Sequence, residues 1–327
     1  MTARGTMEPV IQIEGLSKTY RNRRKTPVQA VKDLSLSVDA GQIFGFLGPN
    51  GAGKTTTIKM ICGLVTADAG SVRVNGRDTV DQRSAVMKDI GVVLEGTRNV
   101  YWRLSAWENL MYFGRLKGKT TGQLRERGER LLRELDIWER RKETVRTFSR
   151  GMQQKVAIAS ALIADPPVVL LDEPTLGLDV PSARTVKRWV ARLAGEEGKT
   201  VILTTHQLQM AEELCDRVAI MQRGELLANE PVDKLLELSG DRHYRIRLEG
   251  ELPDSQLADF PGLDSEQENG TTILSGPIPT QEELFRVLDK VKATGLPLHS
   301  VRRTEVDLEE VFVRMLAPPD AGQAEKD

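Results

Sequence analysis

Short apolar segments alternate with longer amphipathic ones from about residue 10 to residue 235. Apolar and polar side chains alternate at 34–38, which predicts a half-buried strand. Helices are predicted from about Lys54 and within 105–147, where Leu, Arg and Glu recur at helical spacing without a proline. Short apolar runs predict further strands at 10–13, 43–47, 90–93, 168–171, 201–203 and 218–220. Strands that alternate with helices predict an α/β domain with a largely parallel sheet.

The pattern changes near residue 240, where Ser239-Gly240 predicts a linker. After this linker, short alternating segments are accompanied by an amphipathic helix that begins at Thr280 and ends before Gly295. Asp307 and Glu310 have the spacing of a capping box, which predicts another helix start. The strands predicted in this part lie at 244–248, 271–274 and 298–301.

These two patterns predict two domains, as expected for a chain of 327 residues. The first is an α/β domain over 8–238, and the second is a small α+β domain over 241–316. Residues 1–7 and 317–327 are expected to be disordered.

Composition and charge disfavour several classes of function. The 46 Lys and Arg residues nearly balance the 47 Asp and Glu residues, whereas dedicated nucleic-acid binders are usually strongly basic. No segment reaches the ~18 apolar residues of a membrane helix, and the N-terminus shows no secretory signal. Cys62 and Cys215 lie far apart, so no disulfide framework or cysteine metal site is expected. Any action at a membrane is therefore expected to pass through a partner.

A glycine-rich segment, Gly48-Pro-Asn-Gly-Ala-Gly-Lys-Thr55, lies between a predicted strand and a predicted helix. It matches the pattern G-x-x-x-x-G-K-[ST] in the context that this phosphate-binding motif requires. Glycines let backbone N–H groups wrap a phosphate without clashes from Cβ atoms, and the helix N-terminus adds a positive end. We expect Lys54 to reach the β- and γ-phosphates of a nucleotide and the Thr55 hydroxyl to ligate Mg²⁺. The alternative, a glycine turn that merely precedes a helix, is disfavoured by this context.

Two acidic residues, Asp172 and Glu173, end the apolar run at 168–171. Parallel α/β sheets bind ligands at the carboxyl ends of their strands. Asp172 is therefore expected to hold Mg²⁺ through water, and Glu173 to polarise an attacking water molecule as general base. Alone, this pair is equally compatible with a solvated strand end, and the glycine-rich motif favours the catalytic interpretation.

The segment Ser149-Arg-Gly-Met-Gln153 precedes an apolar helix, and alone it predicts only a helix capped by Ser149. In combination with the other motifs, however, the chain resembles the nucleotide-binding subunit of an ABC transporter. The glycine-rich Walker A motif, this signature motif, the acidic Walker B pair and the downstream His206 follow one another in the order of that family. The resemblance covers roughly residues 8–235.

The resemblance implies a P-loop ABC ATPase cassette, a RecA-like core with a helical subdomain at about 97–165. It also implies that ATP and Mg²⁺ are bound, with Lys54, Glu173 and His206 as catalytic residues. In this family the signature serine faces the ATP that a second subunit holds, a position that Ser149 and Gly151 would take here. The Mg²⁺ ligands implied are Thr55, Glu95 and Asp172. Tyr20 would stack on adenine, and Asp179 would belong to the D-loop. The ATP-binding residues implied are Tyr20, Gly48, Pro49, Asn50, Gly51, Ala52, Gly53, Lys54, Thr55, Thr56, Ser149, Gly151 and Asp179.

Two motifs depart from the family pattern. The usual L-S-G-G-Q signature carries Arg150 in place of the first glycine and Met152 in place of the glutamine. Arg150 would either bring charge near the opposing nucleotide or point to solvent, and the sequence does not decide between them. The Q-loop position carries Glu95 instead of glutamine. A glutamate oxygen still ligates Mg²⁺, so we favour a tolerated variant over a slow or regulated ATPase.

Five aromatic residues lie within the thirteen positions that follow the Q-loop, namely Tyr101, Trp102, Trp107, Tyr112 and Phe113. Aromatic side chains are favoured anchors at protein interfaces. In the family this region receives a short helix from the membrane subunit, so we expect a permease contact near Glu95 and at Tyr101–Phe113. Packing inside the helical subdomain is the alternative for some of these side chains.

The expected function is that of an ATP-hydrolysing subunit that dimerises around two ATP molecules and powers a separate permease from the cytoplasmic face of the membrane. The second domain resembles that of drug-resistance exporters, which favours export of a drug-like, lipid or other hydrophobic compound.

The alternatives are a soluble ABC ATPase that acts on nucleic acid or ribosomes, and a regulatory module with a dead site. The long coiled coil and the second cassette of the soluble classes are absent from the sequence, and the intact Walker residues argue against a dead site. The transported substrate, homodimer or heterodimer state and the role of the second domain stay open.

Overall fold

The computed structural model describes residues 9–21, 26–96, 99–238, 243–268, 270–304 and 307–316. The chain divides into two compact units, Met1–Val232 and Asp233–Asp327. Residues 1–7 and 317–327, which are expected to be disordered, and the linker Ser239-Gly240 lie outside the described residues.

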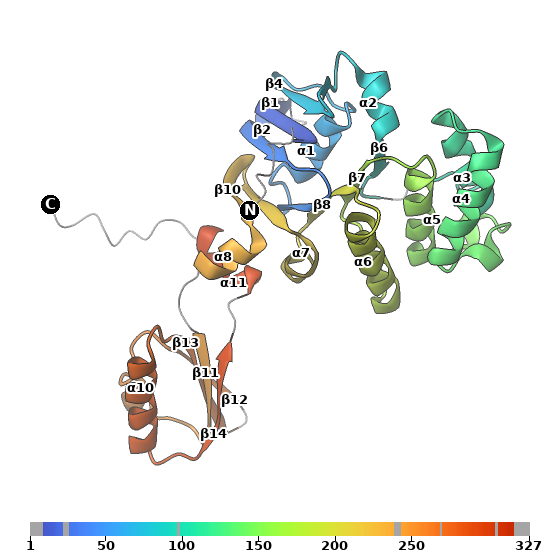
Figure 1. Ribbon diagram of the computed structural model, residues 1–327. Helices are drawn as coiled ribbons and strands as arrows, with labels where there is room; N and C mark the ends of the chain where they lie inside the picture. Colours follow the sequence, from blue (N-terminus) through green and yellow to red (C-terminus); the bar gives the residue numbers. More distant parts are fainter. Residues whose placement is uncertain are drawn as a thin grey trace, which may run out of the picture. The chain divides into compact units, whose positions relative to one another are not determined.

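The first unit is built on a six-stranded sheet in the order β10-β9-β3-β8-β7-β6 (Figure 1). All strands of this sheet are parallel except β10, as predicted for a largely parallel sheet. β3, β7 and β8 are buried along their whole length, which explains why they are continuous apolar runs in the sequence. The strand bounds are β3 Ile43–Leu47, β6 Ile90–Val93, β7 Val168–Asp172, β8 Thr200–Thr205, β9 Arg217–Gln222 and β10 Glu225–Pro231.

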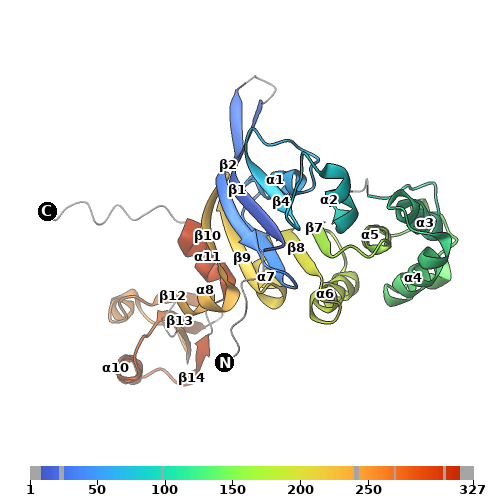
Figure 2. The ribbon, with the colours of Figure 1, turned by 45° about the horizontal axis from the view of Figure 1, so that its top comes forward.

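A second, antiparallel sheet in the order β2-β1-β4-β5 packs against this central sheet (Figure 2). Its bounds are β1 Ile11–Arg21, β2 Pro27–Val38, β4 Ala69–Val74 and β5 Arg77–Asp78. The strand predicted at 34–38 is thus the end of the much longer β2. Apolar side chains of β1, β2 and β4 form one buried cluster with Phe44 and Phe46 of β3 and with Ile58 of the first helix.

Helices connect the strands and cover the central sheet. α1 Lys54–Ile61 begins where the sequence predicts a helix. α2 Arg83–Asp89, α6 Val180–Gly195 and α7 Leu208–Leu214 are the other helices of the core. The predicted helical subdomain contains α3 Ala106–Leu116, α4 Thr121–Glu134 and α5 Arg150–Leu162, with short 3-10 turns at Trp138–Arg140 and Val145–Thr147. Lys117, at the end of α3, ties this subdomain to the core by donating to the carbonyls of Met87 and Ile90.

The second unit contains a four-stranded antiparallel sheet in the order β12-β13-β11-β14, with α10 against one face (Figure 1). Thr280 caps α10 through a complete capping box, as its place at the predicted helix start suggests. Asp307 likewise accepts a hydrogen bond from the backbone N–H of Glu310, at 2.9 Å, before α11. The element bounds are α8 Val232–Leu238, β11 His243–Glu249, α9 Asp254–Leu257, β12 Asp264–Glu268, β13 Thr271–Pro277, α10 Gln281–Ala293, β14 Leu298–Thr304 and α11 Leu308–Leu316.

Candidate functional site

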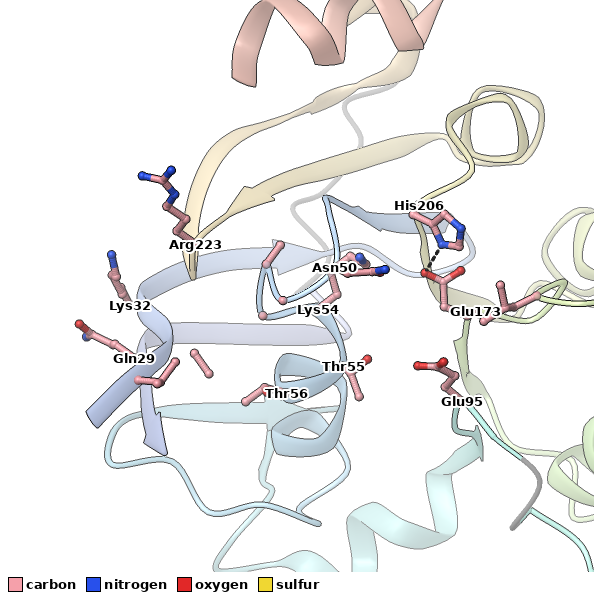
Figure 3. A pocket seen from close by; sticks show the side chains of 16 residues that line it. Gln29, Lys32, Asn50, Lys54, Thr55, Thr56, Glu95, Glu173, His206 and Arg223 are labelled. Carbon is pink, nitrogen blue, oxygen red and sulfur yellow. Dashed lines mark hydrogen bonds and ion pairs between the residues drawn. The ribbon is translucent and has the colours of Figure 1, made fainter. Parts of the chain in front are cut away.

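A cavity of about 900 Å³ lies where β3, β7 and β8 reach their carboxyl ends (Figure 3). Its walls come from the segment between β3 and α1, from the residues after β6, β7 and β8, from β2 and from the turn between β9 and β10. The lining residues are Val28, Gln29, Ala30, Lys32, Asn50, Gly51, Ala52, Gly53, Lys54, Thr55, Thr56, Glu95, Glu173, Leu176, His206 and Arg223. A volume of this size is within the range of ligand pockets.

Two glycines let the chain between β3 and α1 pass close to its neighbours. Gly48 has a φ of +154°, and a Cβ there would lie 2.3 Å from the carbonyl oxygen of Met221. Gly53 has a φ of +108°, and a Cβ there would lie 2.3 Å from the carbonyl oxygen of Ala30. Both positions therefore require glycine. As a result α1 begins at the cavity, where its first backbone N–H groups and positive end suit an anion.

Lys54 is the first residue of α1 and is only 7% exposed. Its ammonium group donates to the carbonyl of Gly48 at 2.6 Å and to that of Pro49 at 3.3 Å. Burial lowers the pKa of Lys54 from its ordinary value, while nearby carboxylates, first that of Glu173, act in the opposite direction. A polyanionic ligand in the cavity would compensate the cost of burying this charge.

Asp172 ends β7 and is 1% exposed. Its Oδ1 accepts hydrogen bonds from the hydroxyl of Thr55 at 3.0 Å and from that of Thr204 at 2.6 Å. Its Oδ2 accepts a longer bond, 3.4 Å, from the backbone N–H of Glu95. The structure thus places the Thr55 hydroxyl and the backbone of Glu95 against the buried carboxylate of Asp172, the third predicted Mg²⁺ ligand.

Glu173 follows β7 in a left-handed backbone conformation, with a φ of 51°. Its backbone N–H donates to Thr204, to the hydroxyl at 3.0 Å and to the carbonyl at 3.2 Å, and these bonds hold the unusual conformation. Nδ1 of His206 lies 3.0 Å from Oε1 of Glu173 (Figure 3). The side chain of Glu173 is 8% exposed and that of His206 is 40% exposed, so the pair faces the cavity from its wall.

The residues present fit a nucleotide with a hard cation. Lys54 supplies one buried positive charge, and Asp172 and Thr55 supply oxygen atoms beside it. Within the described residues no group of three or more His, Cys, Asp and Glu side chains is placed to hold a metal ion. Mg²⁺ is usually bound by only one or two carboxylates, with waters and substrate phosphates completing its shell. The donor set therefore suits Mg²⁺ that arrives together with phosphates.

The predicted signature and D-loop residues lie outside this cavity and pack against each other. Ser149 caps α5 by accepting a bond from the backbone N–H of Met152 at 3.3 Å. Asp179 caps α6 by accepting a bond from the backbone N–H of Ser182 at 2.8 Å, and hydrogen bonds from Ser182 lower the pKa of Asp179. A Cβ at Gly151 would lie 2.5 Å from the hydroxyl of Ser182. The starts of α5 and α6 therefore form one closely packed surface.

Arg150 lies against Gly177 of its own chain, two residues before Asp179. A Cβ at Gly177 would lie 2.6 Å from Nη1 of Arg150 and 2.8 Å from its Cζ. The guanidinium group therefore covers Gly177, while Arg150 as a whole stays exposed. Met152, the other departure, receives a 3.2 Å contact on its sulfur from Nη1 of Arg140.

The remaining predicted ATP-binding residues divide into two groups. Residues 50–56 line the cavity, whereas Gly48 and Pro49 hold Lys54 through their carbonyls. Tyr20 is 40% exposed and pairs with Val28 across the β1–β2 ladder; Val28 lines the cavity and Tyr20 does not. A role of Tyr20 in stacking on adenine stays a prediction.

Three polar residues of the cavity wall were not predicted from the sequence. Gln29, Lys32 and Arg223 lie at the end of the cavity away from Glu173 and His206 (Figure 3). Lys32 forms an ion pair with Glu225 at 2.9 Å. The turn that carries Arg223 reaches the cavity because its next residue, a glycine, donates a 3.0 Å backbone bond to Ala52. No motif in the sequence marks these positions.

The aromatic segment after the Q-loop separates into exposed and packed side chains. Tyr101, Trp102 and Tyr112 are 50%, 46% and 39% exposed and border a second cavity of about 1060 Å³. Trp107 instead packs edge to face on Trp138, with 5.9 Å between ring centroids. The structure thus assigns internal packing to Trp107 and leaves an aromatic hollow, defined by Val100, Tyr101, Trp102, Arg103, Leu104, Tyr112 and Arg146.

Within the ranges that the structure describes, no helix has the length and apolar character needed to cross a membrane.

Comparison with known proteins gives matches to both units. Residues 31–176 match the family described as ABC transporter, and residues 243–302 match a domain of unknown function. The ABC transporter ATP-binding protein NatA of Bacillus subtilis is 39% identical, over 70% of this chain and 92% of its own length. The daunorubicin/doxorubicin resistance ATP-binding protein DrrA of Streptomyces peucetius is 33% identical, over 94% of this chain and 93% of its own length. The linearmycin resistance ATP-binding protein LnrL of Bacillus subtilis is 38% identical, over 74% of this chain and 76% of its own length.

Solved structures match the first unit's fold. An ATP-binding subunit of an ABC transporter aligns with a TM-score of 0.64 and 29% identity, over 71% of this chain and 93% of its own. A dimeric ATP-binding cassette in a post-hydrolysis state with ADP and phosphate aligns with a TM-score of 0.62 and 27% identity, over 68% of this chain and 98% of its own.

Proposed function

Because the chain belongs to the ABC transporter family, as an ATP-binding subunit with ATPase activity, we propose that two such cassettes close around two ATP molecules and drive a separate membrane permease. The second cassette is a copy of this chain or a related subunit. The observation that carries this function is the convergence of Lys54, Thr55 and Glu173 on one cavity, from segments that lie far apart in the sequence. The buried carboxylate of Asp172 is bound to the Thr55 hydroxyl at its wall.

Mg²⁺, when bound with ATP, supplies positive charge that offsets the charge of the β- and γ-phosphates. Thr55 and Asp172 would hold it, because the Thr55 hydroxyl already donates to the Asp172 carboxylate. Glu95 lies beside them, with its backbone N–H bound to the same carboxylate. The P-loop residues 50–56 would surround the phosphates, and the ammonium group of Lys54 would exchange its carbonyl partners for phosphate oxygens.

Hydrolysis requires a water oxygen to attack the γ-phosphorus while a base takes the water proton. The Glu173 carboxylate accepts that proton, the bond from the γ-phosphorus to its bridging oxygen breaks, and ADP and phosphate leave. His206 orients this carboxylate through the 3.0 Å interaction with Oε1 and lies where it would reach the γ-phosphate. Lys54 stabilises the negative charge on the transferred group.

The site is proposed to be completed by a second subunit. Each chain has one P-loop and one signature segment, and Ser149, Gly151 and Asp179 do not line the chain's own P-loop cavity. Ser149 and Gly151 form the start of α5, so the positive end of that helix would meet the phosphates that the other chain holds. The solved relative with ADP and phosphate is a dimer, which supports this arrangement.

We propose that the transporter is an exporter and that this subunit sits at the cytoplasmic face of the membrane through its permease. Relatives named for resistance to daunorubicin, doxorubicin and linearmycin, and one named for Nod factor export in Ralstonia nicotianae, support export of a drug-like, lipid or other hydrophobic compound. The similarity over 94% of the chain to the daunorubicin/doxorubicin protein includes the second unit. The relatives give no support to an action on nucleic acid or ribosomes.

The aromatic hollow is the proposed docking site for the permease. Replacing Trp102, which is 46% exposed, by Ala is expected to weaken co-purification with the permease by about tenfold, because aromatic anchors carry much of the free energy of binding at interfaces. The thermal midpoint of the isolated subunit should stay unchanged. Co-purification and thermal unfolding of the same variant measure the two effects.

Trp107→Ala is the matched control for Trp102→Ala. Trp107 packs on Trp138, so its replacement should lower the thermal midpoint of unfolding. If Trp102→Ala lowers the midpoint as much as Trp107→Ala does, or leaves permease binding intact, the docking role of Trp102 is wrong.

Glu95 is proposed to act as an oxygen ligand of Mg²⁺ and not as a brake on turnover. Its side chain faces Thr55 across the cavity (Figure 3), and its backbone N–H already binds Asp172. Glu95→Gln keeps an oxygen atom but removes the charge, so more Mg²⁺ should be needed for half-maximal activity while turnover at saturating Mg²⁺ stays similar. ATPase rates across a Mg²⁺ series measure both quantities, and a large increase in turnover at saturating Mg²⁺ would show a brake instead.

A further inference from the structure

The sheet of the second unit has one face covered by α10 and one face open to solvent (Figures 1 and 2). Tyr244, Ile246 and Leu248 of β11 point to the covered face and join the core with α10. The residues between them, Arg245 and Arg247, are exposed on the other face. The family match in this region is to a domain of unknown function.

The strand register places acidic side chains at one edge of the open face and basic ones toward the other. In one row across the sheet, the order of residues is Asp264 of β12, Ser275 of β13, Arg245 of β11 and Arg302 of β14. In the next row on this face, the order is Glu266 of β12, Ile273 of β13, Arg247 of β11 and Ser300 of β14. β12 is thus acidic, and β11 with β14 is basic.

We propose that this open face is a contact between two copies of the chain, a second link between the subunits of the ATP-driven dimer. The inference rests on the proposed function, because it requires that the chain pairs with itself. A two-fold axis parallel to the strands, between two facing sheets, would lay β12 of one copy over β14 of the other within the same row. Asp264 of one copy would then lie opposite Arg302 of the other, and the same pair would form twice.

The charge pattern disfavours other ways of covering this face. A two-fold axis across the strands would instead lay β14 over β14 and β12 over β12, so this arrangement would oppose like charges. A nucleic acid or an anionic membrane surface would be attracted by Arg245 and Arg302 but repelled by the acidic edge. Arg245 and Glu266 of this face already form an ion pair at 3.7 Å within the chain. The complementarity between copies therefore rests on Asp264 and Arg302, and a second copy presents these two charges in the reversed order.

The area of the face determines how strong this contact is. Strand spacing and rise give an open face on the order of 400 Å², about half of what each partner buries in a standard stable interface. The face is therefore too small to hold a dimer alone. It would add to the ATP-dependent contact instead, because subunits that are already joined meet at a high effective concentration.

Charge exchange in the full chain tests the proposal. In Glu173→Gln chains with ATP and Mg²⁺, Arg302→Glu should weaken the dimer by about tenfold, because it opposes two acidic pairs. Asp264→Arg alone should weaken it similarly, and the double variant should recover most of the wild-type constant. Asp264 and Arg302 are separated by two strands within one chain, about 14 Å, so recovery cannot come from a pair inside the chain. Sedimentation at several protein concentrations gives each constant.

Arg303→Glu is the matched control. Arg303 is exposed and is the next residue after Arg302, but it pairs with Tyr244, whose side chain packs on the covered face, so Arg303 belongs to that face and not to the open one. It changes the net charge equally and should leave the dimer constant unchanged. If Arg302→Glu behaves like Arg303→Glu, or the double variant stays as weak as the single ones, this inference is wrong and the proposed function stands. If Glu173→Gln chains form no dimer with ATP, the proposed self-pairing itself fails and this inference fails with it.

Discussion

Replacing Glu173 by Gln is expected to lower ATP turnover by ~10²–10⁴, the usual cost of removing a general base. Gln keeps the shape of the side chain but cannot accept the water proton. The backbone bonds from Glu173 to Thr204 do not involve the side chain, so the left-handed conformation at this position should be kept. The variant should therefore bind ATP normally and accumulate in the ATP-bound state.

The rate and the affinity have to be measured on the same preparation. Turnover is followed as phosphate release, with the permease present, and ATP affinity as binding of a labelled nucleotide. Glu196→Gln, at an exposed position just after α6, is the control for the same chemical change away from the cavity and should keep wild-type turnover. Wild-type turnover in Glu173→Gln would remove Glu173 from the mechanism.

Much of the first unit can be predicted from the sequence because its central strands are buried on both faces. β3, β7 and β8 appear as continuous apolar runs for this reason. β10 was missed because it is a half-exposed strand at the sheet edge, with no apolar run or clear alternation. β1 and β2 are longer than predicted because their ladder contains irregular positions that interrupt the alternation of side chains.

The packing of α11 could not be predicted from the sequence for a related reason. The residues of α11 have a helical pattern, but a pattern does not say which neighbour a helix packs against. The core of the small sheet is formed with α10 and α9, and α11 lies beside α8 (Figures 1 and 2). Leu308 and Val311 of α11 are buried, at 0% and 4% exposure. The predicted α+β domain thus contains a sheet that packs with α10, and a last helix, α11, that lies beside α8.

The candidate site is predictable where a motif fixes the backbone, and less so elsewhere. Lys54 and Thr55 belong to one local motif whose glycines determine its shape. Arg223 reaches the same cavity only through a turn between two distant strands. The contact of Arg150 with Gly177 likewise joins two segments that no short pattern connects. Such long-range contacts depend on the packing of whole elements, which a single sequence does not specify.

The second large effect concerns a nucleotide site completed by two chains. If the signature segment of one chain closes on the P-loop of another, ATP should bring Asn50 of one chain close to Arg150 of the other. Both residues are exposed, so each can be replaced by Cys without disturbing the core. The native Cys62 and Cys215 are buried, and burial raises the pKa of the Cys62 thiol to about 12, so they should not compete in disulfide formation.

The most direct test of this shared site is therefore an equal mixture of two chains with one added cysteine each, Asn50→Cys and Arg150→Cys, both in the Glu173→Gln background. With ATP and Mg²⁺, mild oxidation should yield a disulfide-linked dimer of the two different chains. ADP, or either chain alone, should yield little. A mixture that stays unlinked at saturating ATP, in a sample that sediments as a dimer, would contradict a nucleotide site shared between the P-loop of one chain and the signature segment of the other.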